Sequence, residues 1–195
     1  MAQDISLRCT CGQFQAVIHA PGPATDNHAI CYCTDCQAFP RHLGQAARCL
    51  DAAGGTAIYQ TQPSKVEITS GAEHLAVLRL APKGLYRWHT SCCDTPICNT
   101  MGSPKLSFVG FLTCNFDDTT LPPIAFRYKK DQALQPVDAP SGSLAAFAFK
   151  TAKNMLRARV TGRWKNTPFF EAQTGRAVVP PYTLSEAERQ AAYSA

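Results

Sequence analysis

The sequence lacks any long apolar run and any leader-like start. No apolar segment of the 195-residue chain is long enough to cross a bilayer. The stretch Met1–Gln13 also lacks the positively charged start and the following apolar region of a secretory signal. We therefore expect a protein without a membrane span in the reducing cytoplasm, where clustered cysteines more often bind metal or do chemistry than form disulfides.

A strong excess of one charge is also missing. The formal net charge is +5, and the basic residues do not form the dense stripe of a dedicated nucleic-acid-binding protein. The chain contains no internal repeat and no low-complexity tract. These absences argue against a nucleic-acid partner, whereas a small anionic ligand is compatible with a modest positive charge. The sequence leaves open whether the protein forms a homo-oligomer.

The first two thirds of the chain consist of short segments with strand character. They are rich in β-branched and aromatic residues, and several alternate with a period of two. The predicted strands are ISLRC, FQAVIHA, TAIYQT, KVEITS, LAVLRL, LYRWHT and LSFVGFL. Turn signals rather than helical crossovers separate them, so the pattern predicts a mainly β fold with antiparallel strands.

The composition changes after Asn115. Residues 117–143 are rich in Pro, Asp and Ser, which predicts a loop or an extended strap along the surface. Helical patterns follow this stretch. We therefore expect a β domain over residues 1–115, and an extended strap with a helical C-terminal extension over residues 116–195 that packs on it.

The extension carries two predicted helices. The spacing of apolar residues predicts a helix from Leu144 to about Val160, and capping-box patterns predict a second helix that begins near Thr183. We expect the face of the first helix with Leu144, Met155 and Leu156 to dock on the β domain. The opposite face is basic, and we expect it to be solvated; its residues are Lys150, Lys153 and Arg157.

The chain has ten cysteines, although a chain of this length can bury a core without crosslinks. Cys31, Cys33 and Cys36 are too close in sequence for ordinary disulfides among themselves. Three thiolates are one fewer than a closed tetrahedral zinc site requires. Water or a substrate thiol could take the fourth place, or a protein side chain could close the site. The candidates for that side chain are His28, Cys49 and Cys98.

A second set of cysteines lies in two distant segments. Cys9 and Cys11 precede Gly12, and such a Cys-x-Cys-Gly can form a knuckle in which both thiolates face one ion and the glycine permits a tight turn. Cys92 and Cys93 follow much later, in the segment HTSCCDTP. Two such half-sites could close one four-sulfur site. The clusters together predict zinc binding in this β-rich chain.

The cysteine motifs together resemble those of a known family. CTCG, CYCTDC, ITSG and RWHTSCCDTPI follow one another over roughly Ser6–Asn115. This order resembles the glutathione-dependent formaldehyde-activating enzyme family, which includes the centromere protein V relatives. The resemblance implies an Mss4-like zinc-binding β fold with one structural zinc and a second zinc that keeps a position for a substrate thiol. The matching residues are Cys9, Cys11 and Cys93 for the structural zinc and Cys31, Cys33 and Cys36 for the second zinc.

The later motif departs from the family pattern. Thr90 stands where the family has the first cysteine of a Cys-x-x-Cys-Gly, and Asp94 replaces its glycine, which removes easy access to positive φ. Either Cys92 supplies the missing thiolate through an altered turn, or a reserve ligand, His89 or Cys98, completes the site, or the site lacks one ligand. We expect a complete structural zinc site made of Cys9, Cys11, Cys92 and Cys93.

The resemblance implies carbon–sulfur lyase chemistry of the S-hydroxymethylglutathione synthase type. A thiol such as glutathione, held by zinc as a thiolate, would attack an aldehyde such as formaldehyde. Gln37 replaces a basic residue that is frequent in the family, which indicates a divergent subgroup. Arg41 and His42 follow, and we expect Arg41 to hold a substrate carboxylate and His42 to protonate the alkoxide. The alternative is a non-catalytic zinc-stabilised binding module, which full protein ligation of the second zinc would favour.

Overall fold

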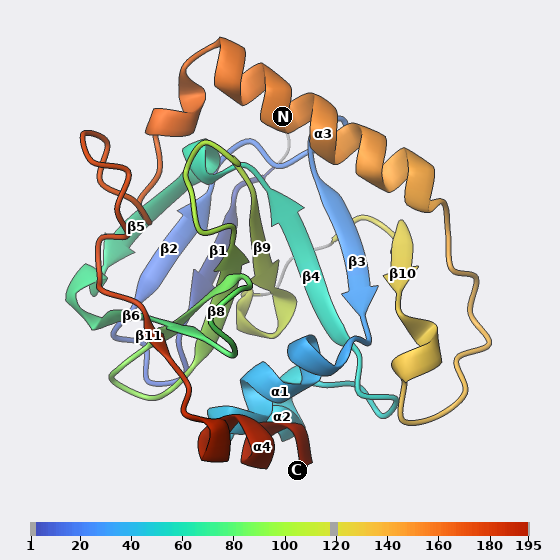
Figure 1. Cartoon of the computed structure of the whole chain (residues 1–195). Helices are drawn as coiled ribbons and strands as arrows, with labels where there is room; N and C mark the ends of the chain where they lie inside the picture. The colour runs from blue at the N-terminus through green and yellow to red at the C-terminus, as the bar shows by residue number, and fades with distance from the viewer. Residues whose placement is uncertain (1–2, 118–120, 195) are drawn as a thin grey trace.

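The computed structural model describes residues 3–117 and 121–194. Within these ranges the chain is mainly β, with two sheets and four α-helices. The helices are α1 (Thr34–His42), α2 (Ala46–Cys49), α3 (Leu144–Val160) and α4 (Glu186–Ser194). α3 runs across one end of the molecule, and the other three helices gather at the opposite end (Figure 1). None of the described helices combines the length and apolar character that a membrane crossing needs.

The strands form one smaller and one larger sheet. They are β1 (Ile5–Arg8), β2 (Gln15–Ile18), β3 (Asn27–Cys31), β4 (Thr56–Thr61), β5 (Val66–Ser70), β6 (Leu75–Arg79), β7 (Tyr86–Thr90), β8 (Pro96–Thr100), β9 (Val109–Leu112), β10 (Phe126–Tyr128) and β11 (Tyr182–Thr183). The smaller sheet has the order β1-β2-β5 and the larger one the order β10-β3-β4-β9-β8-β7-β6-β11. The two edge strands of the larger sheet, β10 and β11, pair in parallel with β3 and β6, and the other pairs are antiparallel.

The strand predictions are largely confirmed. Seven predicted segments coincide with β1, β2, β4, β5, β6, β7 and β9. The sequence patterns missed β3 and β8, and they also missed α1 and α2, which lie in the part of the chain where only strands and turns were expected. α2 has four residues, and α1 has nine with Pro40 inside it. Helices this short do not display a clear helical period.

The predictions for the extension hold for its helices. α3 covers the predicted helix, and α4 is the second one. The N–H of Ser185 donates to the carboxylate of Glu188 at 2.8 Å, which forms the capping box before α4. The predicted strap over residues 117–143 is mostly irregular but contributes β10 to the larger sheet. Residues 118–120 of that strap lie outside the described residues.

Two apolar clusters hold the elements together. The main cluster contains side chains of both sheets, and at its centre the fully buried Trp88 packs on Phe169, with ring centroids 5.1 Å apart. Phe169 comes from the segment after α3, so the C-terminal part of the chain contributes to the main core. The second cluster lies under α1, α2 and α4 and includes Phe39, Leu78 and Leu112.

The apolar face of α3 does not dock as predicted. Leu144 is 54% exposed and Leu156 is 63% exposed, while Met155 is half-buried. Phe149 on the same helix is 71% exposed. The expectation that the Leu144–Met155–Leu156 face packs on the β core is therefore wrong.

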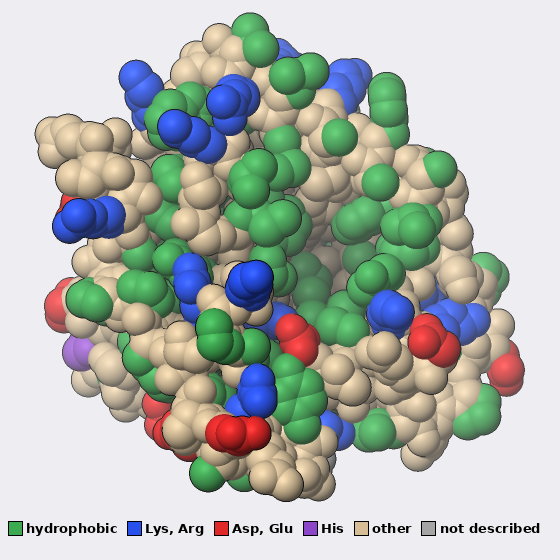
Figure 2. Space-filling view, viewed as in Figure 1, with side chains coloured by type: hydrophobic (Ala, Val, Ile, Leu, Met, Phe, Trp, Pro, Cys, Tyr) green, Lys and Arg blue, Asp and Glu red, His purple; other side chains and the backbone are tan. Residues whose placement is uncertain are grey.

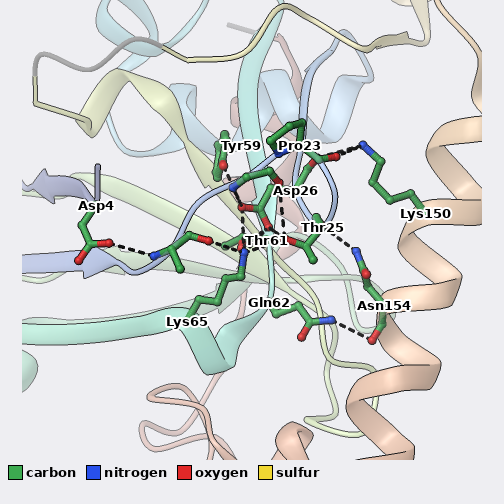
Figure 3. A network of polar contacts seen from close by, with 12 residues as sticks. Asp4, Pro23, Thr25, Asp26, Tyr59, Thr61, Gln62, Lys65, Lys150 and Asn154 are labelled. Atoms are coloured by element: carbon green, nitrogen blue, oxygen red, sulfur yellow. Dashed lines mark hydrogen bonds and ion pairs between the residues drawn. The ribbon is translucent and has the colours of Figure 1, made fainter. Parts of the chain in front are cut away.

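A polar seam attaches α3 instead. The ammonium group of Lys150 donates to the carbonyl of Pro23 at 2.8 Å and to the carbonyl of Asp26 at 3.2 Å. The amide of Asn154 donates to the carbonyl of Thr25 at 2.6 Å. These carbonyls belong to the loop before β3, and loop carbonyls that are partly shielded from water need donors. Lys150, expected to be solvated, therefore faces the β domain (Figure 3).

Asp26 holds the loop that receives α3 (Figure 3). Its side chain is fully buried and forms an ion pair with Lys65 at 3.0 Å. Its two oxygens also accept hydrogen bonds from the hydroxyls of Tyr59 at 2.9 Å and Thr61 at 2.8 Å. The backbone N–H of Gly22 donates to the same carboxylate at 2.8 Å. One carboxylate thus joins β4, the segment before β5 and the loop under α3.

Candidate metal centres

Four cysteines of the first set converge on one point. Their sulfurs all lie within 4.8 Å of one another. Cys9 directly follows β1 and Cys92 lies in the turn after β7, and their sulfurs are 3.8 Å apart. The sulfur of Cys11 lies 3.4 Å from that of Cys92, and Cys93 completes the group. The structure therefore brings Cys92 into one group with Cys9, Cys11 and Cys93, as expected for a complete four-sulfur site.

Two tight turns make this convergence possible. Gly12 has φ of 79° and Asp94 has φ of 49°, both in the left-handed region. Aspartate is one of the few non-glycine residues that tolerate this region, so the replacement of glycine does not prevent the turn. The hydroxyl of Thr95 accepts a hydrogen bond from the backbone N–H of Thr10 at 3.0 Å, which ties the two turns together.

The surroundings of Cys93 favour its thiolate. Burial opposes ionisation, but hydrogen bonds from Thr10, Thr90 and Thr95 outweigh it and lower the pKa of Cys93 to about 5. His89, the reserve ligand, is buried on β7, and burial lowers its pKa. Among the described residues, His89 does not bring a ring nitrogen into the group formed by the four sulfurs. Four thiolates suffice for a closed tetrahedral site of the structural type.

Three cysteines form the second group. Cys31 ends β3, Cys33 precedes the first residue of α1, and Cys36 lies in the first turn of α1. The sulfurs of Cys31 and Cys33 are 3.2 Å apart, and all three lie within 4.8 Å of one another. The strand end and the helix start thus hold the three sulfurs together. In the described part of the chain, no His, Cys, Asp or Glu joins this group as a fourth ligand.

The three side chains considered as a fourth protein ligand contact other groups or lie elsewhere in the fold. His28 Nδ1 donates to the carbonyl of Pro122 at 2.7 Å. Cys49 pairs with Cys114, with sulfurs 2.7 Å apart. Cys98 is fully buried in the main core. A metal ion held by Cys31, Cys33 and Cys36 would therefore have three protein ligands and could take a further ligand from outside the chain.

Arg87 on β7 is the cation that accompanies the second group. Its side chain is buried, and one guanidinium nitrogen lies 3.7 Å from the sulfur of Cys36. Another guanidinium nitrogen lies 3.7 Å from the carboxylate of Asp35. Hydrogen bonds from Cys31 and Cys33, together with the charge of Arg87, hold the pKa of Cys36 well below its ordinary value. The N-terminus of α1 favours a thiolate in the same direction.

Gln37, Arg41 and His42 follow the cysteine run and all lie in α1. Gln37 is buried, and its amide donates to the carbonyls of Tyr32 and Gln132 at 2.7 and 2.9 Å. Arg41 donates to the side-chain oxygen of Gln37 at 3.2 Å. His42 is the last residue of α1, six positions after Cys36. The structure does not bring Arg41 or His42 to the wall of the cavity beside the sulfurs.

That cavity adjoins the three sulfurs and has a volume of about 600 Å³. Cys31, Cys33 and Cys36 form part of its wall, as do Asp35 and Arg87. Most of the other lining side chains are apolar and come from β3, β4, β10 and α3. Figure 2 shows a hollow in the middle of this face, lined mainly by hydrophobic side chains below α3.

A family model matches residues 1–179 of the chain, and its description is "Family of unknown function (DUF6151)". The chain belongs to this family. No curated protein shows significant similarity to it. A crystal structure of a Rhodobacter sphaeroides protein is similar at 16% sequence identity and a TM-score of 0.42, over 64% of this chain and 99% of that one.

Arg87 is the residue of this DUF6151 chain that the sequence patterns missed. It lies in LYRWHT, which was assigned only as a strand. All five residues of β7 are buried, and a charged residue inside a fully buried strand requires partners. That combination is a usable signal, but it depends on knowing that both faces of the strand are covered. Asp35 carries a weaker signal, since it lies between two cysteines of the run.

Proposed function

We propose that this protein is a zinc-dependent carbon–sulfur lyase-like protein that adds a thiol to an aldehyde and reverses that addition. The observation that carries the proposal is the group of three cysteine sulfurs without a fourth ligand from the described residues, placed in the wall of a cavity. The motif resemblance to the glutathione-dependent formaldehyde-activating enzymes supports it. The proposal includes an Mss4-like fold for the β domain and, since all ten cysteines are free thiols, a cytoplasmic location.

The donor sets suit zinc. Thiolates are soft ligands that favour zinc among the common divalent ions, and four of them make a closed structural site at Cys9, Cys11, Cys92 and Cys93. At the three-sulfur group, bound zinc would lower the pKa of an incoming thiol and keep it as a thiolate. The first site would stabilise the fold, and the second would face the substrate.

The side chains around the second group supply the remaining chemistry. Asp35 lines the cavity and can take the proton that the thiol loses. When the sulfur bonds to the carbonyl carbon, the π electron pair moves to the oxygen, and the same proton converts the alkoxide to the hemithioacetal hydroxyl. Arg87 orients Asp35 and balances the charge of Cys36. Asp35 thus takes the proton-transfer role that the sequence suggested for His42, whereas Arg87 serves the cysteine group and does not take the carboxylate-binding role suggested for Arg41.

Metal analysis and cobalt substitution test this proposal. We expect about two metal ions per chain and two sets of thiolate-to-cobalt absorption bands, one set for each centre. Cys33→Ser should remove one set while the circular dichroism spectrum keeps its β shape. A thiol ligand should then shift the bands that Cys33→Ser removes and leave the others unchanged.

Two results would contradict the lyase proposal. If saturating concentrations of several thiols shift neither set of bands, the three-sulfur group does not bind thiols and the lyase proposal fails. A non-catalytic, zinc-stabilised binding module would then take its place. If the purified protein binds no metal, both readings fail.

A further inference from the structure

We propose that the substrate that binds in the cavity beside the three-sulfur group is largely apolar. The cavity takes an alkyl or aryl thiol or aldehyde in preference to glutathione and formaldehyde. This inference rests on the proposed function, because it concerns what binds beside the three-sulfur group. It departs from the substrate that the family resemblance implies. The composition of the wall, the pairing of its polar groups and the origin of its roof support it.

The wall offers little but apolar surface. The side chains that project from the sheet and from the loops around it include Ile30, Ile58, Met101 and Phe108. A volume of about 600 Å³ is ample for a small organic ligand, so size alone does not exclude glutathione. The decisive property is that a charged tripeptide would lose its hydration against carbon atoms, whereas an alkyl chain gains from the same contact.

The charged and amide side chains in the wall already have partners within the protein. Arg87 is the one cation among the described lining residues, and it faces Asp35 and Cys36. It also donates to the side-chain oxygen of Asn99 at 3.0 Å. The amide of Gln60 is bonded to Asn27 and, on α3, to Thr151. Glutathione carries two carboxylates and an ammonium group, and the described wall provides no uncommitted cation for the carboxylates.

The extension supplies the outer part of the cavity. Phe126 and Tyr128 on β10 and Leu144 and Phe147 on α3 all line it. The rings of Phe147 and Phe126 pack with centroids 5.4 Å apart. The polar seam fixes α3 across this end of the sheet, and the helix turns Phe147 toward the cavity and leaves Phe149 outside. The strap and helix therefore build an apolar roof over the three-sulfur group.

A homologous series of thiols tests the inference on the full-length cobalt-substituted protein. The readout is the shift of the bands that Cys33→Ser removes, titrated with propanethiol, hexanethiol and glutathione. Each methylene buried in an apolar cavity strengthens binding about fourfold, so hexanethiol should bind roughly 60-fold more tightly than propanethiol. Glutathione should bind more weakly than either alkyl thiol.

A pair of matched variants locates the effect. Phe147→Ser removes an apolar side chain from the cavity wall and should reduce the hexanethiol preference at least tenfold. Phe149→Ser is the same change two positions along α3, at a side chain that is 71% exposed, and should leave the preference unchanged. If Phe147→Ser does not fold, Leu144→Ser makes the same test, because Leu144 also lines the cavity and is already 54% exposed.

The possible outcomes test the apolar ligand and the lyase proposal separately. A preference for hexanethiol that Phe147→Ser weakens supports the apolar ligand. Equal binding of propanethiol and hexanethiol, or tighter binding of glutathione, overturns the apolar ligand and leaves the lyase proposal standing. Equal effects of Phe147→Ser and Phe149→Ser would show that the alkyl chain of the thiol does not occupy this cavity, and would also overturn the apolar ligand. If no thiol shifts the bands, the lyase proposal fails and this inference fails with it.

Discussion

Replacement of Asp26 by asparagine should destabilise the protein strongly and loosen α3. The carboxylate of Asp26 is fully buried, and the groups that approach it are donors: Lys65, Tyr59, Thr61, the hydroxyl of Thr25 and the N–H of Gly22. In Asp26→Asn one carboxylate oxygen becomes an NH₂ group that faces these donors. The ammonium group of Lys65 then has no full negative charge to balance it.

The size of the effect follows from the burial of the pair. Removal of one partner from a buried ion pair costs about 3–5 kcal/mol, because the remaining charge is desolvated without compensation. A native domain has about 5–15 kcal/mol of stability in total, so Asp26→Asn removes a large part of it. For a chain of this length, 1 kcal/mol corresponds to about 2–4 °C in Tm. We therefore expect Tm to fall by about 6–20 °C.

Thermal and urea unfolding, followed by circular dichroism, measure this loss. Asp4→Asn is the matched control, because the Asp4 side chain is 47% exposed and its ion pair with His19 lies at the surface. We expect the control to change Tm little. In Asp26→Asn the carbonyls that hold Lys150 and Asn154 lose their support, so backbone amides of α3 should also exchange with solvent faster. Equal Tm values for the two variants would refute the assignment of Asp26 as the anchor of this loop.

Three further predictions follow from the metal centres and the surface. Cys11→Ser should lower both the metal content by about one ion per chain and Tm, because a structural ion stabilises the folded state that binds it; loss of metal without a change in Tm would contradict this role. Arg87→Met should weaken cobalt binding at the three-sulfur group by about 10–100-fold, as measured by chelator competition, and unchanged affinity would remove Arg87 from the centre. Hydrogen bonds to Asp4 and Glu67 raise the pKa of His19 above 6.5, so its stabilising contribution is complete below about pH 6.5 and disappears as pH rises through the raised value. Stability curves of the parent and of His19→Gln should therefore diverge below that window and converge above it.

The sequence predicted the strands well because their signals are local. Each predicted segment alternates or is rich in β-branched and aromatic residues, and turn residues separate the segments. β8, with the sequence PICNT, lacks this signal because it is buried on both faces and carries polar side chains that find partners only in the fold. Trp88 donates to the hydroxyl of Thr100, and Arg87 donates to Asn99, so long-range contacts make this segment a strand.

The orientation of α3 could not be read from its apolar pattern. The pattern assumes that the surface receiving a helix is apolar. Here the receiving surface is a loop whose carbonyls, at Pro23, Thr25 and Asp26, need donors, and Lys150 and Asn154 supply them. Satisfying these backbone groups outweighed the burial of more leucine surface, because unpaired carbonyls under a helix would be costly.

The cysteine groups were predictable in membership but not in their surroundings. Sequence spacing brought Cys31, Cys33 and Cys36 together as one set, and the structure places their sulfurs within 4.8 Å of one another. In the later motif Cys92 stands two positions after Thr90, where a cysteine was expected, and the structure brings Cys92 into the first group beside a left-handed turn at Asp94 that the sequence did not predict. Asp35 lies within the cysteine run itself, whereas Arg87 reaches the second group from β7 through side-chain contacts with Asp35 and Cys36, which no local pattern encodes.

The same polar seam links the fold to the proposed chemistry. If α3 had docked through its leucine face, its position over the sheet would have depended on non-directional apolar contacts. Hydrogen bonds from Lys150 and Asn154 to loop carbonyls instead fix its direction, and that direction places Phe147 in the cavity wall. A fixed outer wall would serve the proposed chemistry, in which a thiolate attacks a carbonyl carbon away from water. The buried ion pair of Asp26 stabilises the loop, the loop positions the helix, and the helix closes the apolar side of the three-sulfur group.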